Sequence, residues 1–109
     1  MAVAYKVLGQ VLPSAITNTT LYTVPSATSS VCSTLAICNQ GTVTTNVRVA
    51  IRPAGATLAS SQYIVYDTQV NLNDTLFFTL GISLATTDVV TVYAGTANVS
   101  FSLFGSEIS

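Results

Sequence analysis

The segment VTTNVRVAIR, from Val43 to Arg52, has the most regular alternation of apolar and polar residues in the chain. One side of the alternation holds Val43, Thr45, Val47, Val49 and Ile51, and the other holds Thr44, Asn46, Arg48, Ala50 and Arg52. Side chains of an extended strand point alternately to its two faces, so this pattern predicts a half-buried antiparallel strand. Pro53 follows and ends it, because proline cannot donate to a strand ladder.

Similar runs recur along the rest of the sequence, separated by Pro, Gly, Asn, Asp and Ser at intervals of about ten residues. The expected strands are Tyr5–Leu12, Thr20–Val24, Val31–Cys38, Tyr63–Asp67 with an extension over Thr68–Val70, Thr75–Leu80, Val89–Ala94, and a run through Val99, Phe101 and Leu103. The segment 54–62 fits either a loop or a single helical turn. Residues 81–88 are expected to form a bend and a loop.

No segment has a convincing helical period. The pattern predicts an all-β protein, an antiparallel β-sandwich of about eight strands with a jelly-roll or Greek-key arrangement. At 109 residues the chain has the length of one domain, so residues 1–109 are expected to form a single β-sandwich domain.

Charge is scarce in this sequence. Lys and Arg number three, Asp and Glu number four, and the charged fraction is 6%, against about 25% in typical soluble domains. We interpret the depletion as a surface that lies against copies of the same chain or against other subunits. A plain uncharged monomer rich in Ser and Thr is the alternative.

The same composition argues against other partners. Three scattered cations cannot neutralise a run of phosphates, so no nucleic-acid binding is expected. The longest apolar run, 76–85, is too short for a membrane span and contains polar residues, so no membrane insertion is expected. The start of the chain lacks the charged and apolar regions of a secretory signal, so we expect no export.

The sequence also lacks the residues that most often carry out catalysis. The chain has no His, the commonest general base and metal ligand, and no phosphate-binding glycine motif. We therefore expect no enzyme activity, no catalytic residues, no cofactor and no metal. Asp67, Asp74 and Asp88 are interpreted as turn residues rather than a catalytic pair. Cys32 and Cys38 would lie about 20 Å apart on one face of a strand, which predicts two free, buried thiols.

Four side chains are candidates for a protein interface: Arg48, Arg52, Tyr63 and Tyr66. Arginine and tyrosine are enriched at interface hot spots, although solvated surface arginines are an equally good reading. Arg48 and Arg52 are expected to share the solvent face of their strand. Tyr63 and Tyr66 are expected on opposite faces, one in the core and one on the surface.

The order of several segments resembles a known group of proteins. The segments are LYTVP (21–25), VCSTLAICNQG (31–41), RPAGA (52–56), YIVYD (63–67), NDTL (73–76), TDVVTVY (87–93) and VSFSLFGSEI (99–108). Together they resemble small virion structural proteins of tailed bacteriophages, including phages of cyanobacteria. The resemblance implies a β-sandwich in the particle, as a capsid decoration (cement) protein or as a tail, neck or baseplate accessory, and it brings no catalytic residues. Many cement proteins clamp with a long terminal arm, whereas here only residues 1–4 and 105–109 look free.

The leading hypothesis is a capsid decoration subunit that stabilises the shell by bridging capsid subunits. It would associate with itself, as a trimer, and with the major capsid protein or another virion protein, in a virion assembled in the host cytoplasm. The first rival is a tail, neck or baseplate accessory that attaches fibres. More remote rivals are a carbohydrate-binding module, although the chain has no Trp for stacking sugars, and an ice-binding surface, although the threonines lack regular spacing.

Overall fold

The computed structural model describes residues 2–109 and contains eight strands with two short 3-10 turns. The strands are β1 (Val3–Val11), β2 (Thr19–Thr23), β3 (Ser29–Asn39), β4 (Thr45–Arg52), β5 (Tyr63–Val70), β6 (Thr75–Leu84), β7 (Val89–Ala94) and β8 (Val99–Ile108). The turns η1 (Pro53–Gly55) and η2 (Ser60–Gln62) lie between β4 and β5, in the segment that the sequence left open between loop and helical turn. Within the described residues, no helix is long and apolar enough to cross a membrane.

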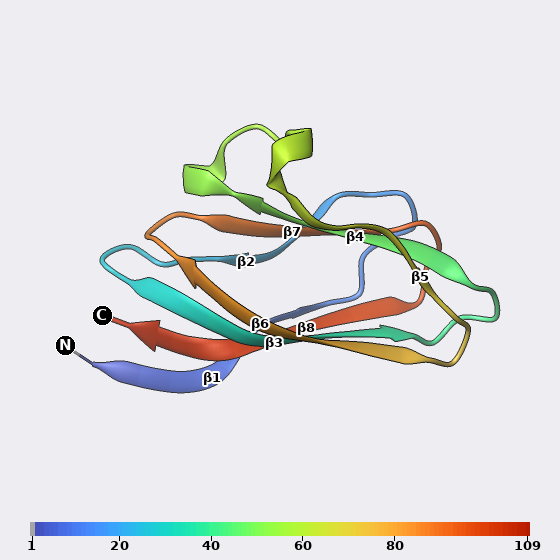
Figure 1. The fold of residues 1–109 in the computed structure, drawn as a ribbon, viewed down its shortest axis with the longest axis horizontal. Helices are drawn as coiled ribbons and strands as arrows, with labels where there is room; N and C mark the ends of the chain where they lie inside the picture. Colours follow the sequence, from blue (N-terminus) through green and yellow to red (C-terminus); the bar gives the residue numbers. More distant parts are fainter. Residues whose placement is uncertain (1) are drawn as a thin grey trace.

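The strands form two four-stranded antiparallel sheets packed face to face (Figure 1). Sheet A has the order β1-β8-β3-β6 and sheet B the order β2-β7-β4-β5. Every connection between consecutive strands crosses from one sheet to the other, except the connection from β4 to β5. This is the connectivity of an eight-stranded jelly roll, so the predicted all-β sandwich is confirmed.

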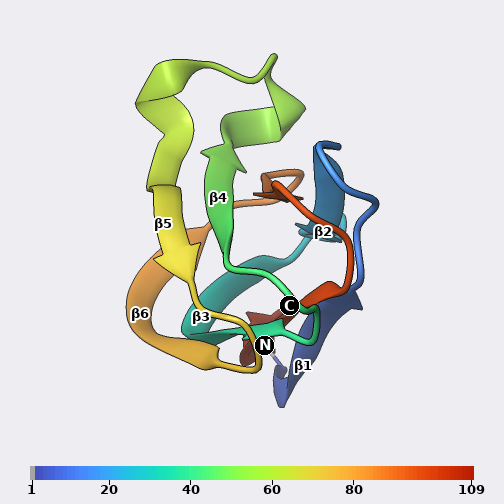
Figure 2. The same ribbon diagram turned by 90° about the vertical axis from the view of Figure 1, so that its right-hand side faces the viewer.

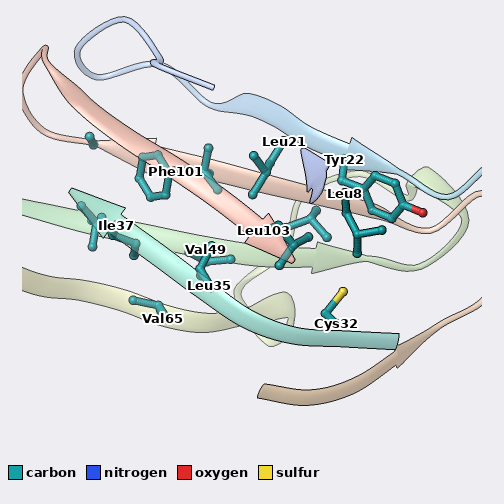
Figure 3. Close-up of a cluster of buried hydrophobic side chains, with 14 of the residues drawn as sticks. Leu8, Leu21, Tyr22, Cys32, Leu35, Ile37, Val49, Val65, Phe101 and Leu103 are labelled. Carbon is teal, nitrogen blue, oxygen red and sulfur yellow. The ribbon is translucent and has the colours of Figure 1, made fainter. Parts of the chain in front are cut away.

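One hydrophobic core fills the space between the sheets (Figure 3). Sheet A contributes fully buried side chains that include Leu35, Ile37 and Phe101, and sheet B contributes Val49 and Val92. Alternation along β4 is as predicted from Thr45 to Val49, since Thr45, Val47 and Val49 are buried while Asn46 is exposed. Two residues differ from the prediction: Val43 lies before the strand and is exposed, and Ala50 is buried.

The two ends of the chain are not free, contrary to the expectation for residues 1–4 and 105–109. β1 begins at Val3, and its pairing with β8 continues to Ile108. Ala2 and Ser109 also exchange two backbone hydrogen bonds, of 2.8 and 2.9 Å. The termini therefore lie side by side as paired strand ends (Figures 1 and 2). Met1 lies outside the described residues.

The bend and loop expected over residues 81–88 begin later than predicted. β6 continues through Gly81 to Leu84, because Ile82 and Leu84 keep the inward alternation that Leu76, Phe78 and Leu80 begin. A glycine weakens a strand but does not end it when the neighbouring residues remain paired. Only residues 85–88 connect β6 to β7.

A bulge in β3 changes which of its residues face the core. The pairing with both neighbours shifts between Cys32 and Thr34: relative to β8, Ser33 is an extra residue of β3, whereas relative to β6 the extra residue lies on β6. Cys32 therefore faces the core with Leu35 and Ile37, whereas Val31 is exposed. The prediction of one shared face for the two cysteines is wrong. Both are free, but Cys32 is buried and Cys38 is only half-buried.

β3 lies centrally between β8 and β6 and is covered on one face only. Sheet B covers the inner face of β3. The outer face carries half-exposed small residues such as Ala36 and Cys38, which explains why both faces of its sequence look apolar.

Candidate functional site

The outer face of sheet B carries an ion pair between two neighbouring strands. Arg48 of β4 donates two hydrogen bonds to Asp67 of β5, with 2.6 Å from Nε to Oδ1 and 3.3 Å from Nη2 to Oδ2. This fork geometry fixes both side chains better than a single contact would. The hydrogen bonds to Asp67 hold the pKa of the Arg48 guanidinium above its usual value, so the pair stays charged but locally neutral.

Two tyrosine rings flank the same guanidinium. The Cζ atom of Arg48 lies 4.5 Å from the ring centroid of Tyr66 and 4.6 Å from that of Tyr93. Tyr93 is the direct register partner of Arg48 on β7, and Tyr66 comes from β5. Both distances are within the range of cation–π attraction. The arginine is thus held between two aromatic rings and a carboxylate.

Tyr63 joins this group through Tyr66. Their ring centroids are 4.9 Å apart, with an angle of 73° between the ring planes, an edge-to-face pair. The prediction that the two tyrosines occupy opposite faces is therefore wrong. The pairing of β5 with β4 shifts twice between Tyr63 and Thr68, and these bulges break the simple alternation. We call Arg48, Tyr63, Tyr66, Asp67 and Tyr93 the Tyr–Arg cluster.

Arg52, the fourth interface candidate, does not join the cluster. Its guanidinium donates to the backbone carbonyls of Ala56 at 2.7 Å and Gly55 at 3.0 Å, and it lies 3.5 Å from the hydroxyl of Thr91. These bonds hold the η1 turn against sheet B. Its interface role remains a prediction, beside an evident role in loop structure.

Sequence reasoning missed two members of the Tyr–Arg cluster. Asp67 was interpreted as a turn residue, but it lies inside β5 with a positive φ of 51° and binds Arg48. Tyr93 carried a usable signal, because it alternates with buried Val92 and Ala94 and must face outward. Its place beside Arg48 depends on the order of strands in sheet B, which the alternation does not give.

The other two aspartates do act as turn residues. Asp88 accepts hydrogen bonds from the backbone N–H groups of Ala54 at 2.8 Å and Ala85 at 2.9 Å. Asp74 accepts one from Thr75 at 2.9 Å. Among residues 2–109, no three His, Cys, Asp or Glu side chains gather in an arrangement that could hold a metal ion.

A shallow polar hollow of about 490 Å³ adjoins the Tyr–Arg cluster. Asn46 and Gln69, which are register partners on β4 and β5, line it together with Arg48, Asp67 and Tyr93. The hollow also reaches the β7–β8 turn at Gly95. Its lining offers amide and carboxylate groups and, because Arg48 and Asp67 neutralise each other, little net charge.

The outer face of sheet A differs sharply from that of sheet B. Its exposed large apolar residues are Val3, Tyr5, Val7, Val31 and Phe77. The only charged residues in the four strands of sheet A are Lys6 and Glu107. Both point away from this outer face, because Glu107 reaches across to sheet B and Lys6 bonds to Glu107. The outer face of sheet A is therefore apolar and hydroxylic, with no charged side chain among the described residues.

Those two charges form a second polar cluster at the end of the sandwich where the chain termini meet. Lys6 Nζ lies 3.0 Å from Glu107 Oε1, and the hydroxyl of Tyr22 donates to Glu107 Oε2 at 2.6 Å. Tyr22 also lies 2.6 Å from the hydroxyl of Ser30. Burial, and then the bond to Glu107, raise the pKa of Tyr22 to about 12. The bonds from Tyr22 and Lys6 lower the pKa of Glu107.

Comparison with known proteins shows likeness in structure but not in sequence. No protein-family model and no curated protein matches the chain. Solved structures do match, among them the crystal structure of the T13 IBDV viral particle and a structure of the infectious bursal disease virus Gx strain. Each aligns with a TM-score of 0.53 and 12% identity, covering 97% of this chain and 30% of the other. The chain thus spans less than a third of those proteins, and at this identity the likeness shows a shared fold.

Proposed function

We propose that this protein is a virion structural subunit that contributes surface, not catalysis, to a viral particle. The observation that carries the proposal is the uncharged outer face of sheet A. The outer face of a four-stranded sheet, exposed to water and without a charged side chain, has the composition of an interface core, which is depleted in charge and enriched in aromatic residues. Tyr5 and Phe77 are 86% and 72% exposed on this face, so large apolar surface is available for burial.

The fold supports the same proposal. The jelly roll is a common architecture of viral capsid domains, and the two matching structures named above come from virus particles. The same fold also serves lectins and cupins, so the fold alone does not decide the function. The fold and the uncharged face together favour a subunit that packs against other subunits.

The finer proposal is a decoration (cement) subunit on the shell of a tailed bacteriophage, as the sequence resemblance implies. Sheet A would lie against the shell or against neighbouring copies, and the Tyr–Arg cluster on the opposite sheet would offer a second contact. Two contact surfaces on one rigid module are what bridging of shell subunits requires. Self-association, with a trimer as the expectation from sequence, is part of this proposal.

The experiment is quantitative mass spectrometry of particles purified from the virus that encodes this chain. A copy number equal to that of the major shell protein, or a simple fraction of it, supports the decoration role. A handful of copies per particle would instead indicate a component of the tail, neck or baseplate, which is the first alternative. Absence from purified particles overturns the virion proposal altogether.

A second candidate function, carbohydrate binding, is favoured by the polar hollow beside Asn46 and Gln69. Planar amide groups can donate to and accept from sugar hydroxyls, and carboxylate groups can accept from them. The Tyr93 ring, however, already holds the Arg48 guanidinium 4.6 Å from its centroid, so a stacked sugar would have to compete with this contact or use the other face of the ring. A glycan array probed with the purified protein tests this, and a blank array removes the candidate.

A further inference from the structure

We infer that the edge of β6 is a self-association site, at which β6 of one copy pairs antiparallel with β6 of a second copy. This deepens the proposed function, on whose self-association it rests, by naming the contact surface and the partner, and it replaces the trimer expected from sequence with a dimer. The pairing would join two four-stranded sheets A into one eight-stranded sheet across a two-fold axis.

The two sheets have four edge strands, and three of them are short or carry a charge, which discourages pairing with another chain. Charges, bulges and short length are the usual protections. β1 has Lys6 and a bulge, β2 has five residues and a bulge, and β5 has Asp67 and two register shifts.

β6 has neither charge nor proline in its ten residues, TLFFTLGISL. Its pairing with β3 includes one extra residue on β6, because Cys32 and Thr34 pair with Ile82 and Thr79. The alternation of β6 is nevertheless unbroken, with Phe77, Thr79, Gly81 and Ser83 exposed and the residues between them half-buried or buried. A long, uncharged edge with this alternation is a template for another strand.

The inward-facing side chains of β6 are also incompletely covered. Leu76, Phe78, Leu80 and Ile82 pack against the core but remain partly exposed. Figure 2 shows β6 at the left side of the sandwich, with β5 of the other sheet above it. A strand added along β6 would cover this apolar row.

A second copy of β6 fits this edge better than an unrelated strand for three reasons. First, no like charges meet at the two-fold axis, because the strand has none. Second, two ten-residue antiparallel strands exchange about ten main-chain hydrogen bonds, the number found in a typical whole protein interface. Third, an isologous pair closes at two copies and forms no open fibre.

The side chains indicate one register. When Thr79 pairs with Thr79 of the second copy, Phe77 lies opposite Gly81, and Leu76 lies opposite Ile82. A Cβ atom built on Gly81 has no heavy atom within 4 Å, so there is open space beside it. The exposed Phe77 ring of the second copy would fill that space, as aromatic residues do opposite strand glycines.

Sedimentation velocity of the purified full chain over a concentration series tests the inference. We expect a monomer–dimer equilibrium in the wild type. Thr79→Lys places two like charges at the two-fold axis and should shift the protein to monomer. The matched control is Ser102→Lys, which puts the same charge on the same outer face but on central strand β8, and should leave the dimer intact.

Disulfide trapping tests the register directly. In a Cys38→Ser background, Thr79→Cys should give a covalent dimer under mild oxidation, because directly paired antiparallel residues have Cα atoms about 4.5–5.5 Å apart, within disulfide range. Ser102→Cys in the same background should not. Circular dichroism of each variant checks that it is folded.

Three results would overturn the inference. The wild type could be a monomer, it could be a trimer, or it could be a dimer that Ser102→Lys dissociates and Thr79→Lys does not. Each of these outcomes concerns the purified chain only. The virion proposal is tested separately by copy number in particles, so one can fail while the other stands.

Discussion

The hydroxyl of Tyr22 on β2 donates a 2.6 Å hydrogen bond to the carboxylate of Glu107 on β8, and so links the two sheets at the end where the termini meet. Tyr22 is 7% exposed, so water has little access to its hydroxyl and cannot readily replace the carboxylate of Glu107 as its hydrogen-bond partner. Removing one partner of a buried hydrogen bond to a charged group costs about 1.5–3 kcal/mol. Tyr22→Phe should lower the free energy of unfolding by that amount, measured by urea denaturation, whereas Tyr5→Phe, at an exposed site, should leave it unchanged.

Burial of Tyr22 and its bond to Glu107 make stability depend on pH at both ends of the scale. The pKa of Glu107 is lowered in the folded state, so its contribution is present above the ordinary carboxyl range and is lost as pH falls through the lowered pKa. The pKa of Tyr22 is raised from 10.0 to about 12, so its contribution is complete below pH 10 and is lost as pH rises toward 12.

Urea titrations across the pH range check this dependence. Tyr22→Phe should flatten the loss of stability between pH 10 and 12, and Glu107→Gln should flatten the loss on the acid side. Unchanged pH profiles in both variants would show that the bond contributes no stability.

The two thiols should differ in reactivity. Cys32 is fully buried, and burial raises its pKa to about 11, so little reactive thiolate forms at neutral pH. Cys38 is half-buried on the outer face of sheet A. A thiol reagent should therefore modify one cysteine quickly in the folded protein and both in denaturant. Cys38→Ser should remove the fast phase, and a persisting fast phase would place the accessible thiol at Cys32 instead.

Alternation of apolar and polar residues predicted the fold class and most strand positions, because burial of one sheet face imposes that period directly. β7 was predicted with its full bounds, Val89–Ala94. The errors about which face of a sheet a side chain occupies come from bulges. One extra residue at Ser33 separated the two cysteines, and the shifts in β5 brought Tyr63 and Tyr66 together. A bulge depends on neighbouring strands, so the sequence of the strand alone does not reveal it.

The candidate site was partly predictable for a related reason. Arg48, Tyr63 and Tyr66 were identified from residue type, but their contact with Asp67 and Tyr93 depends on strand order. β4 lies between β5 and β7, although β7 is distant in sequence. Strand order in a sandwich follows from connections across two layers, which local periodicity does not encode.

Gly105 is a position where the absence of a side chain is required by close backbone approach. A Cβ atom built there would overlap the carbonyl oxygen of Val31 and lie 3.0 Å from the Cα of Cys32, at the bulge where β8 meets β3. Backbone atoms of a central strand cannot move aside without breaking the ladder. Gly105→Ala should therefore destabilise the fold by about 1–3 kcal/mol or more, in the range of overpacked cores.

The matched control is Ser106→Ala, at the next residue of β8. The Ser106 side chain points to the outer face, so this substitution should change the free energy of unfolding by less than about 0.5 kcal/mol. Thermal and urea unfolding of both variants give the comparison. Equal stabilities for the two variants would mean that β8 and β3 are farther apart at the bulge than the structure shows. A large loss for Gly105→Ala alone would establish that this close approach fixes the register between the two central strands of sheet A.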